Sequence, residues 1–173
     1  CNPNLVEVGI NTIRPGFVTW LTHGSGRGAQ AVMLQGNARS LPDDKPFFTF
    51  QASCYNGQPT TPDNLAYELL KNGAIGTIGA ATISHGPGSP MASLRNDAGN
   101  AGMAYNFAER LIAQGMSAGE ALTDLRASVG LSNRWWYWKN YLTFNLWGDP
   151  SVGINSHAME EPAAMDDAGV TAD

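Results

Sequence analysis

Three short apolar runs, each closed by turn residues, constrain the fold of this chain more than any other feature. They occupy 17–22, 47–53 and 74–81. Aromatic and β-branched residues fill the first two, which is typical of strands, and the second and third suit strands covered on both faces. Segments with helical spacing follow at 62–71, 100–114 and 117–128. The alternation predicts an α/β fold, a mostly parallel sheet with helices on both faces.

The rest of the pattern divides the chain into one domain and a tail. A Trp-rich segment at 134–138 leads into a predicted last strand at 141–146. We expect these aromatics to pack in the core beside that strand, and a carbohydrate platform or an interface patch is the alternative. From 156 the sequence is rich in Ala, Glu, Asp and Met without periodicity. We therefore predict a folded domain over 1–155 and an acidic disordered tail or linker over 156–173.

Composition excludes two classes of partner. The formal net charge is -5 and only 14% of residues are charged, with no Lys/Arg run that could bind a phosphate backbone. No stretch approaches the roughly 18 apolar residues of a membrane span. We expect neither nucleic acid nor a membrane span.

His23 and Cys54 occupy matching places, just after the first and second apolar runs. They lie 31 positions apart, which is enough for one crossover between neighbouring parallel strands, so both side chains would emerge at one sheet edge. Taken singly, the histidine would be a turn residue and the cysteine a small buried hydrophobe or a partner of Cys1. Taken together, they predict a thiol nucleophile with an imidazole partner. The N–H groups of Gly24 and Cys54 could stabilise an oxyanion.

These residues also carry a resemblance to a known family. Thr-His-Gly-Ser at 22–25, Ala-Ser-Cys-Tyr-Asn-Gly at 52–57, Lys-Asn-Gly-Ala-Ile at 71–75, Ser-Pro-Met at 89–91 and Trp-Gly-Asp-Pro-Ser at 147–151 occur in one order across about 10–154. The set resembles the gingipain family of cysteine peptidases, in the caspase-like fold group. The resemblance implies a caspase-like three-layer α/β/α sandwich and a cysteine endopeptidase acting on peptides or proteins.

The resemblance also implies roles for individual residues. Cys54 would be the nucleophile, His23 the proton donor, and Gly24 with Cys54 the oxyanion donors. Residues 84–91 correspond to the wall of the primary specificity pocket. The substrate-binding candidates are Ser53, which directly precedes the nucleophile, and His85, Gly86 and Met91 in that wall. His85 is alternatively an exposed loop residue, and Met91 either lines the pocket or packs beneath it.

One departure from the family concerns the start of the sheet. Family members have a further strand–helix portion before the His-Gly strand, whereas only 22 residues precede His23 here. We expect that the N-terminal part of the sheet is missing from this chain and is supplied by an N-terminal fragment of the same precursor. The family's habit and the low Lys content suggest a secreted or bacterial cell-envelope protein that undergoes proteolytic processing.

The sequence leaves three functions to compare. The leading one is the cysteine endopeptidase, and the alternative is a catalytically silent caspase-like scaffold or interaction module. A serine or lipid hydrolase is disfavoured because the Gly-x-Ser-x-Gly match at 115–119 follows a segment with helical spacing, whereas a nucleophile elbow follows a strand. No cofactor is implied. Structural calcium is possible at three acidic positions, 43–44, 149 and 166–167, although none has the spacing of a helix–loop–helix calcium site.

Overall fold

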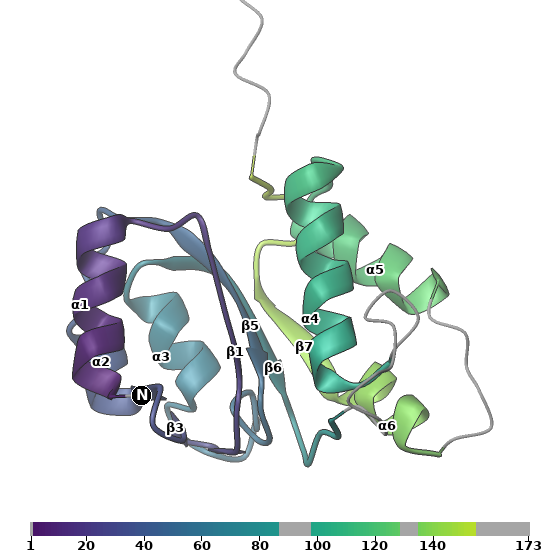
Figure 1. The fold of residues 1–173 in the computed structure, drawn as a ribbon, viewed down its shortest axis with the longest axis horizontal. Coiled ribbons are helices and arrows are strands. Elements are labelled where there is room, and N and C mark those ends of the chain that lie inside the picture. The colour runs from purple at the N-terminus through teal and green to yellow at the C-terminus, as the bar shows by residue number, and fades with distance from the viewer. Residues whose placement is uncertain (1, 87–97, 129–134, 155–173) are drawn as a thin grey trace, which may run out of the picture.

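The computed structural model describes residues 2–86, 98–128 and 135–154 as three layers (Figure 1). A four-stranded sheet in the order β1-β5-β6-β7 forms the middle layer. Helices α1, α2 and α3 cover one face, and α4, α5 and α6 lie on the other. The predicted three-layer α/β/α fold is confirmed. No helix in these ranges is long and apolar enough to cross a bilayer.

The sheet is mostly parallel, as its sequence pattern predicted. β1 (Phe17–Leu21), β5 (Phe47–Ala52) and β6 (Ala74–Ala80) run parallel, and β7 (Phe144–Gly148) is antiparallel to β6. All six residues of β5 are buried, because strands flank it on both sides and helices cover both faces. Phe47 packs into the core under α1–α3, while Phe48 and Phe50 pack into the core under α4 and α5.

Side-chain caps set the starts of several helices. Asn64 accepts a hydrogen bond from the Tyr67 N–H at 3.0 Å, so α3 begins at Leu65, three residues later than predicted. Ser117 and Glu120 form the predicted capping box, with the Ser117 N–H donating to Glu120 Oε2 at 3.0 Å. The helices are α1 (Pro3–Ile13), α2 (Gln35–Arg39), α3 (Leu65–Lys71), α4 (Asn100–Ala108) with its π-helical continuation η2 (Glu109–Ala113), α5 (Ala118–Ser128) and α6 (Trp135–Thr143).

A second, small sheet replaces the loop expected after His23. It consists of β2 (Gly24–Ser25), β3 (Gly28–Ala29) and β4 (Met33–Leu34), paired antiparallel in that order. Two-residue strands are too short to leave an alternating pattern in a sequence. The glycine-rich run at 24–28 therefore predicted a turn correctly but gave no sign of the paired strands around it.

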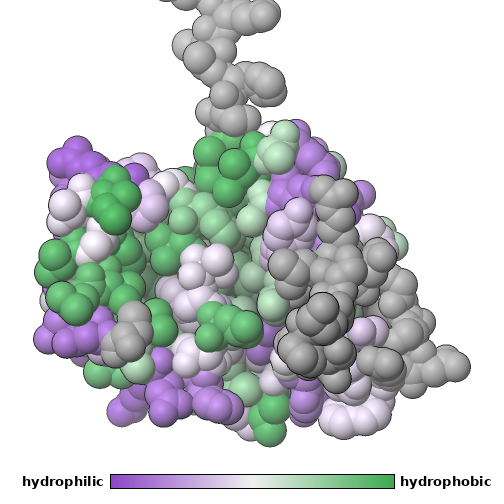
Figure 2. Space-filling view, in the orientation of Figure 1, coloured by the Kyte–Doolittle hydropathy of each residue, from purple (hydrophilic) through white to green (hydrophobic). Residues whose placement is uncertain are grey.

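The last strand and the Trp-rich segment also differ from the prediction. α6 extends to Thr143, so β7 starts at Phe144 rather than at 141. A short apolar run fits a buried helix as well as a strand, and pattern alone does not separate them. Trp135 and Trp138 are 66% and 47% exposed, so the expectation that they pack in the core was wrong. Figure 2 shows a further apolar area over α1, where Leu5, Val8 and Ile13 are exposed.

Candidate active site

The register of the sheet brings His23 and Cys54 to one edge. β1 and β5 are neighbours, with Leu21 opposite Ala52, and the Thr22 N–H extends the ladder to the Ala52 carbonyl at 3.3 Å. Both strands therefore end at the same level, and both side chains follow directly. They line one cleft of about 310 Å³, whose lining residues are Leu21, Thr22, His23, Cys54, Ser84, Gly86 and Asn100.

Cys54 is a free, partly buried thiol that contacts Ser84 in the loop after β6. Its Sγ donates to the Ser84 carbonyl at 3.5 Å and accepts from Ser84 Oγ at 3.9 Å. The Asn100 amide donates to Ser84 Oγ at 3.0 Å. The resemblance placed residues 84–91 at the pocket wall, but neither Ser84 nor Asn100 was named as a site residue. The rule that found the other two points to the loop after β6, but Ser84 lies four residues past the end of that strand, whereas His23 and Cys54 lie two residues past theirs.

The turn that carries Cys54 is fixed from both sides. Tyr55 has a positive φ of 63°, an unfavourable conformation for a residue with a side chain. Its N–H donates to the Thr82 carbonyl at 3.1 Å, and the Gly57 N–H donates to the Ala80 carbonyl at 3.0 Å. A Cβ at Gly57 would lie 2.8 Å from the Gly79 carbonyl oxygen, so only glycine permits this approach to β6.

Gly24 brings the histidine loop against the cysteine loop. A Cβ at this position would collide with the Cys54 carbonyl oxygen and lie 2.9 Å from the Ser53 Cβ. Within the described residues the Cys54 N–H donates to no backbone carbonyl, whereas the N–H groups of Ser53 and Tyr55 both do. The amide of the candidate nucleophile is therefore available to a bound carbonyl oxygen.

The other predicted site residues are placed differently. Ser53 is fully buried, donates to Asn56 Oδ1 and accepts from Trp20 Nε1, so its side chain lies behind the cleft and not in it. The His85 ring packs against Trp135, with ring centroids 5.1 Å apart, while Gly86 lines the cleft. Met91 lies outside the described residues.

The surroundings of His85 disfavour the charged form of its imidazole. Burial lowers its pKa, and the positive charge of Lys139 lowers it further. The Asn140 amide fixes the backbone of His85 in both directions, accepting from its N–H and donating to its carbonyl, each at 2.8 Å. His85 thus supports the wall of the cleft next to Gly86.

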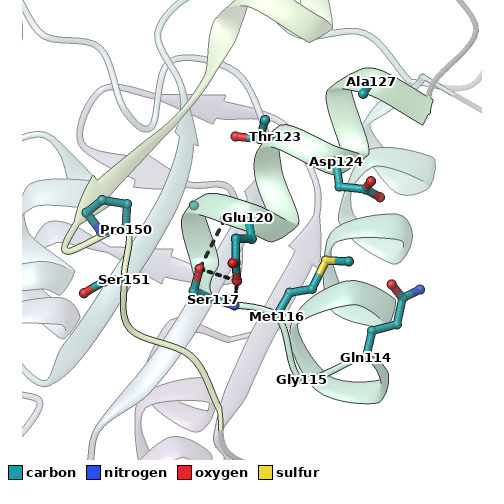
Figure 3. Close-up of a pocket in the computed structure, with 11 residues that line it drawn as sticks. Gln114, Gly115, Met116, Ser117, Glu120, Thr123, Asp124, Ala127, Pro150 and Ser151 are labelled. Carbon is teal, nitrogen blue, oxygen red and sulfur yellow. Dashed lines mark hydrogen bonds between the residues drawn. The ribbon is translucent and has the colours of Figure 1, made fainter.

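A larger hollow lies at the opposite edge of the sheet (Figure 3). It has a volume of about 970 Å³ and lies between η2, α5 and the turn after β7. Its carboxylates already have partners, since Glu120 belongs to the capping box and Asp124 accepts from Arg110 Nε at 2.6 Å. It contains no cysteine or histidine, so the chemistry of the smaller cleft has no counterpart there.

The possible calcium ligands are not gathered around one point. Asp149 accepts from the Ser151 N–H at 2.8 Å and from its hydroxyl at 2.7 Å, which closes the turn after β7. Asp43 and Asp44 lie in the loop before β5, and 166–167 fall outside the described residues. No group of three or more His, Cys, Asp or Glu side chains suited to a metal ion occurs among the described residues.

Comparison with known proteins gives a family and a fold. Residues 14–155 match the model of Peptidase family C25. The structure is similar to the crystal structure of the Arg specific cysteine proteinase gingipain R, with a TM-score of 0.69, at 14% identity over 88% of this chain and 36% of that chain. A structure described only as a protease gives a TM-score of 0.54, at 17% identity over 84% and 36%. No curated protein matches.

The chain thus spans 36% of the length of each of these two structures. Identities this low establish the fold, whereas the family match extends over most of the sequence and includes His23, Cys54 and the Gly-Asp-Pro-Ser turn. The resemblance to gingipains is confirmed, and this chain belongs to peptidase family C25.

Proposed function

We propose that this chain carries the catalytic dyad of a cysteine endopeptidase, with Cys54 as nucleophile and His23 as proton donor. The observation that carries the proposal is the shared cleft at the ends of neighbouring parallel strands. Membership of a peptidase family supports it. Cys54 is open to the cleft and His23 is exposed, so a polypeptide can reach both.

The proposed reaction proceeds through a thioester. His23 accepts the thiol proton of Cys54, the Sγ thiolate attacks the carbonyl carbon of the scissile bond, and the electron pair of the C=O double bond moves to the carbonyl oxygen. The N–H groups of Gly24 and Cys54 stabilise that oxyanion. As the intermediate collapses, the C–N bond breaks and His23 transfers a proton to the departing amine. Water then attacks the thioester while His23 accepts a proton from it. The C–S bond breaks, the product leaves as a carboxylic acid that ionises, and the Cys54 thiolate recovers the proton from His23.

The same cleft provides the proposed specificity pocket. Leu21, Ser84 and Gly86 line it together with the nucleophile. We assign the side chain before the scissile bond to this space, with His85 supporting the wall from behind and Met91 as a proposed further contact. Ser53 acts from beneath, through its hydrogen bond to Asn56.

Three further proposals concern what surrounds the enzyme. β1 is the end strand of the sheet, and a groove of about 420 Å³ runs between it and α4. We propose that an N-terminal fragment of the same precursor, produced by processing, adds a strand there.

The thiol and imidazole supply nucleophile and proton, so the reaction as proposed needs no cofactor. A secreted or cell-envelope location is also a proposal.

Labelling with a peptide that carries a thiol-reactive electrophile tests the dyad. Cys54→Ala should abolish labelling, and His23→Ala should lower the rate of peptide hydrolysis by about 100-fold or more. Cys1→Ala is the matched control and should label like the parent chain. A metal chelator should leave the labelling of both proteins unchanged, because the proposed reaction uses no metal ion. A folded protein that neither labels nor cleaves any member of a peptide library would instead support the silent scaffold.

A further inference from the structure

One buried amide connects the loop that carries His23 to the loop that carries Cys54. Asn56 is fully buried, two residues after the candidate nucleophile. Its Nδ2 donates to the Ser25 carbonyl at 2.7 Å and to the Gly28 carbonyl at 3.1 Å. Those carbonyls belong to β2 and β3, the hairpin that begins directly after His23. Both N–H bonds of the amide are therefore directed at the histidine side of the cleft.

The other end of the amide continues a chain of hydrogen bonds back to β1. Trp20 Nε1, which can only donate, donates to Ser53 Oγ at 3.2 Å. The Ser53 hydroxyl then has its own hydrogen for Asn56 Oδ1. This direction fixes the amide, because a rotated Asn56 would turn its oxygen toward two carbonyl oxygens. Trp20, Ser53 and Asn56 are all buried, so water does not readily replace any partner.

Asn56 is itself anchored to the rest of the molecule. Its carbonyl accepts from the Ala66 N–H at 2.9 Å, and the N–H groups of Tyr55 and Gly57 donate to residues of the β6 side. The β2–β3–β4 sheet, in contrast, has no ladder to the main sheet in the part of the chain that the structure describes. The side chain of Asn56 thus joins the hairpin to the cysteine loop. The hairpin is also held from α3, where the Leu65 N–H donates to the Gly26 carbonyl at 2.8 Å. Its Nδ2 also lies 3.0 Å from where a Cβ of Gly24 would be.

We propose that Asn56 is a positioning residue that holds His23 and Gly24 at a fixed distance from Cys54. The inference rests on the proposed peptidase function. A displacement of the hairpin would move the proton donor and one oxyanion donor together, while the nucleophile and the pocket wall at Gly86 stay in place. Loss of this contact should therefore lower kcat and leave KM nearly unchanged, because misplacement of reacting groups by about 1 Å can cost about 100-fold in rate.

Asn56→Asp isolates the link to the hairpin. The carboxylate keeps an acceptor for Ser53 but has no N–H for Ser25 and Gly28, and its charge repels both carbonyls. The matched control is Asn64→Asp, at a residue that is 3% exposed. That change removes the 3.2 Å bond from Nδ2 to the Gln58 carbonyl but keeps the cap on α3.

The expected result is a kcat for Asn56→Asp lower by about 10- to 100-fold at nearly unchanged KM, with Asn64→Asp close to the parent chain. Hydrogen exchange of the amides of 24–34 should be faster in Asn56→Asp only. Equal kcat losses in both variants, or full activity in Asn56→Asp, would overturn the proposal.

Hydrogen exchange also separates this proposal from the proposed function. If the parent chain cleaves no peptide, faster exchange in the hairpin still supports the positioning role, and unchanged exchange contradicts it. Should Asn56→Asp fail to fold, Ser53→Ala provides the second test. It leaves Asn56 Oδ1 without its donor and should loosen the same hairpin, and an unaltered exchange rate there would count against the role of Asn56.

Discussion

At the scale of residues, the candidate site depends on glycines that allow two backbone segments to touch. Gly24 lies against the cysteine loop, and Gly57 lies against β6. Neither requires a positive φ, so the restriction comes from space and not from backbone conformation. Side-chain volume at these points would therefore separate the loops that the proposed reaction brings together.

Gly24→Ala should damage both activity and stability. The added methyl would force the histidine hairpin away from Cys54, at a cost of roughly 1–3 kcal/mol in the free energy of unfolding. Gly9→Ala is the matched control, since nothing lies within 4 Å of a Cβ in the middle of α1. That change should stabilise the chain by up to about 1 kcal/mol. Urea unfolding and peptide hydrolysis measure both, and an active, fully stable Gly24→Ala protein would contradict this account.

The two candidate reactive residues could be predicted from the sequence, but the buried side chains that support their loops could not. His23 and Cys54 follow apolar runs directly, and that position has a known meaning in parallel sheets. Ser53 was assigned to the substrate although it is buried, because a pattern of residues does not show on which side of a turn a side chain points. Asn56 reads as an ordinary turn residue until its long-range hydrogen bonds are known.

At the scale of elements, a buried carboxylate joins α2 to α3. Glu68 is 1% exposed and accepts from Arg39 Nε at 3.1 Å and from Lys71 Nζ at 2.8 Å. Burial alone would raise the pKa of Glu68, but the hydrogen bonds from Arg39 and Lys71 outweigh it and hold the pKa below its ordinary value of 4.5. The ionised form therefore stabilises the folded chain.

The sign of the pH dependence follows from that lowered pKa. The contribution of Glu68 is complete above about pH 4.5 and is lost as the pH falls through the lower folded value. Glu68→Gln should reduce the free energy of unfolding by roughly 1–3 kcal/mol at neutral pH and flatten the decline below pH 4.5. Asp44→Asn, at an exposed loop position, is the control. Urea unfolding between pH 3 and pH 7 measures the effect, and parallel curves for Glu68→Gln and the parent would refute it.

Elements with long, buried patterns were predicted well, and short or ambiguous ones were not. β5 and β6 are buried on both faces, so their apolar runs are nearly continuous. The junction of α6 and β7 was misplaced because Tyr141 and Leu142 suit either element. The buried side-chain amide of Asn140 joins α6 to the segments on either side of residues 87–97, through hydrogen bonds to His85 and Ala98. Such a long-range contact produces no periodic pattern in the sequence around Asn140.

At the scale of the whole molecule, the sheet ends at β1 with one side unpaired among the described residues. Leu21 is 57% exposed there, next to both the cleft and the groove against α4. An unpaired strand edge readily binds another strand. Native mass spectrometry of the protein from its natural source should therefore show a complex heavier than 18.4 kDa that separates into two chains in denaturant. A fully active species of 18.4 kDa would contradict the strand-addition proposal.

The parallel ladder between β1 and β5 has a consequence for how freely this protein can vary. Its hydrogen bonds join main-chain atoms, so the spacing of positions 23 and 54 depends little on which side chains the two strands bear. Similar folds at 14% identity agree with this. Substitutions should accordingly be widely tolerated within the two strands, and the intolerant positions should be the few residues directly after their ends.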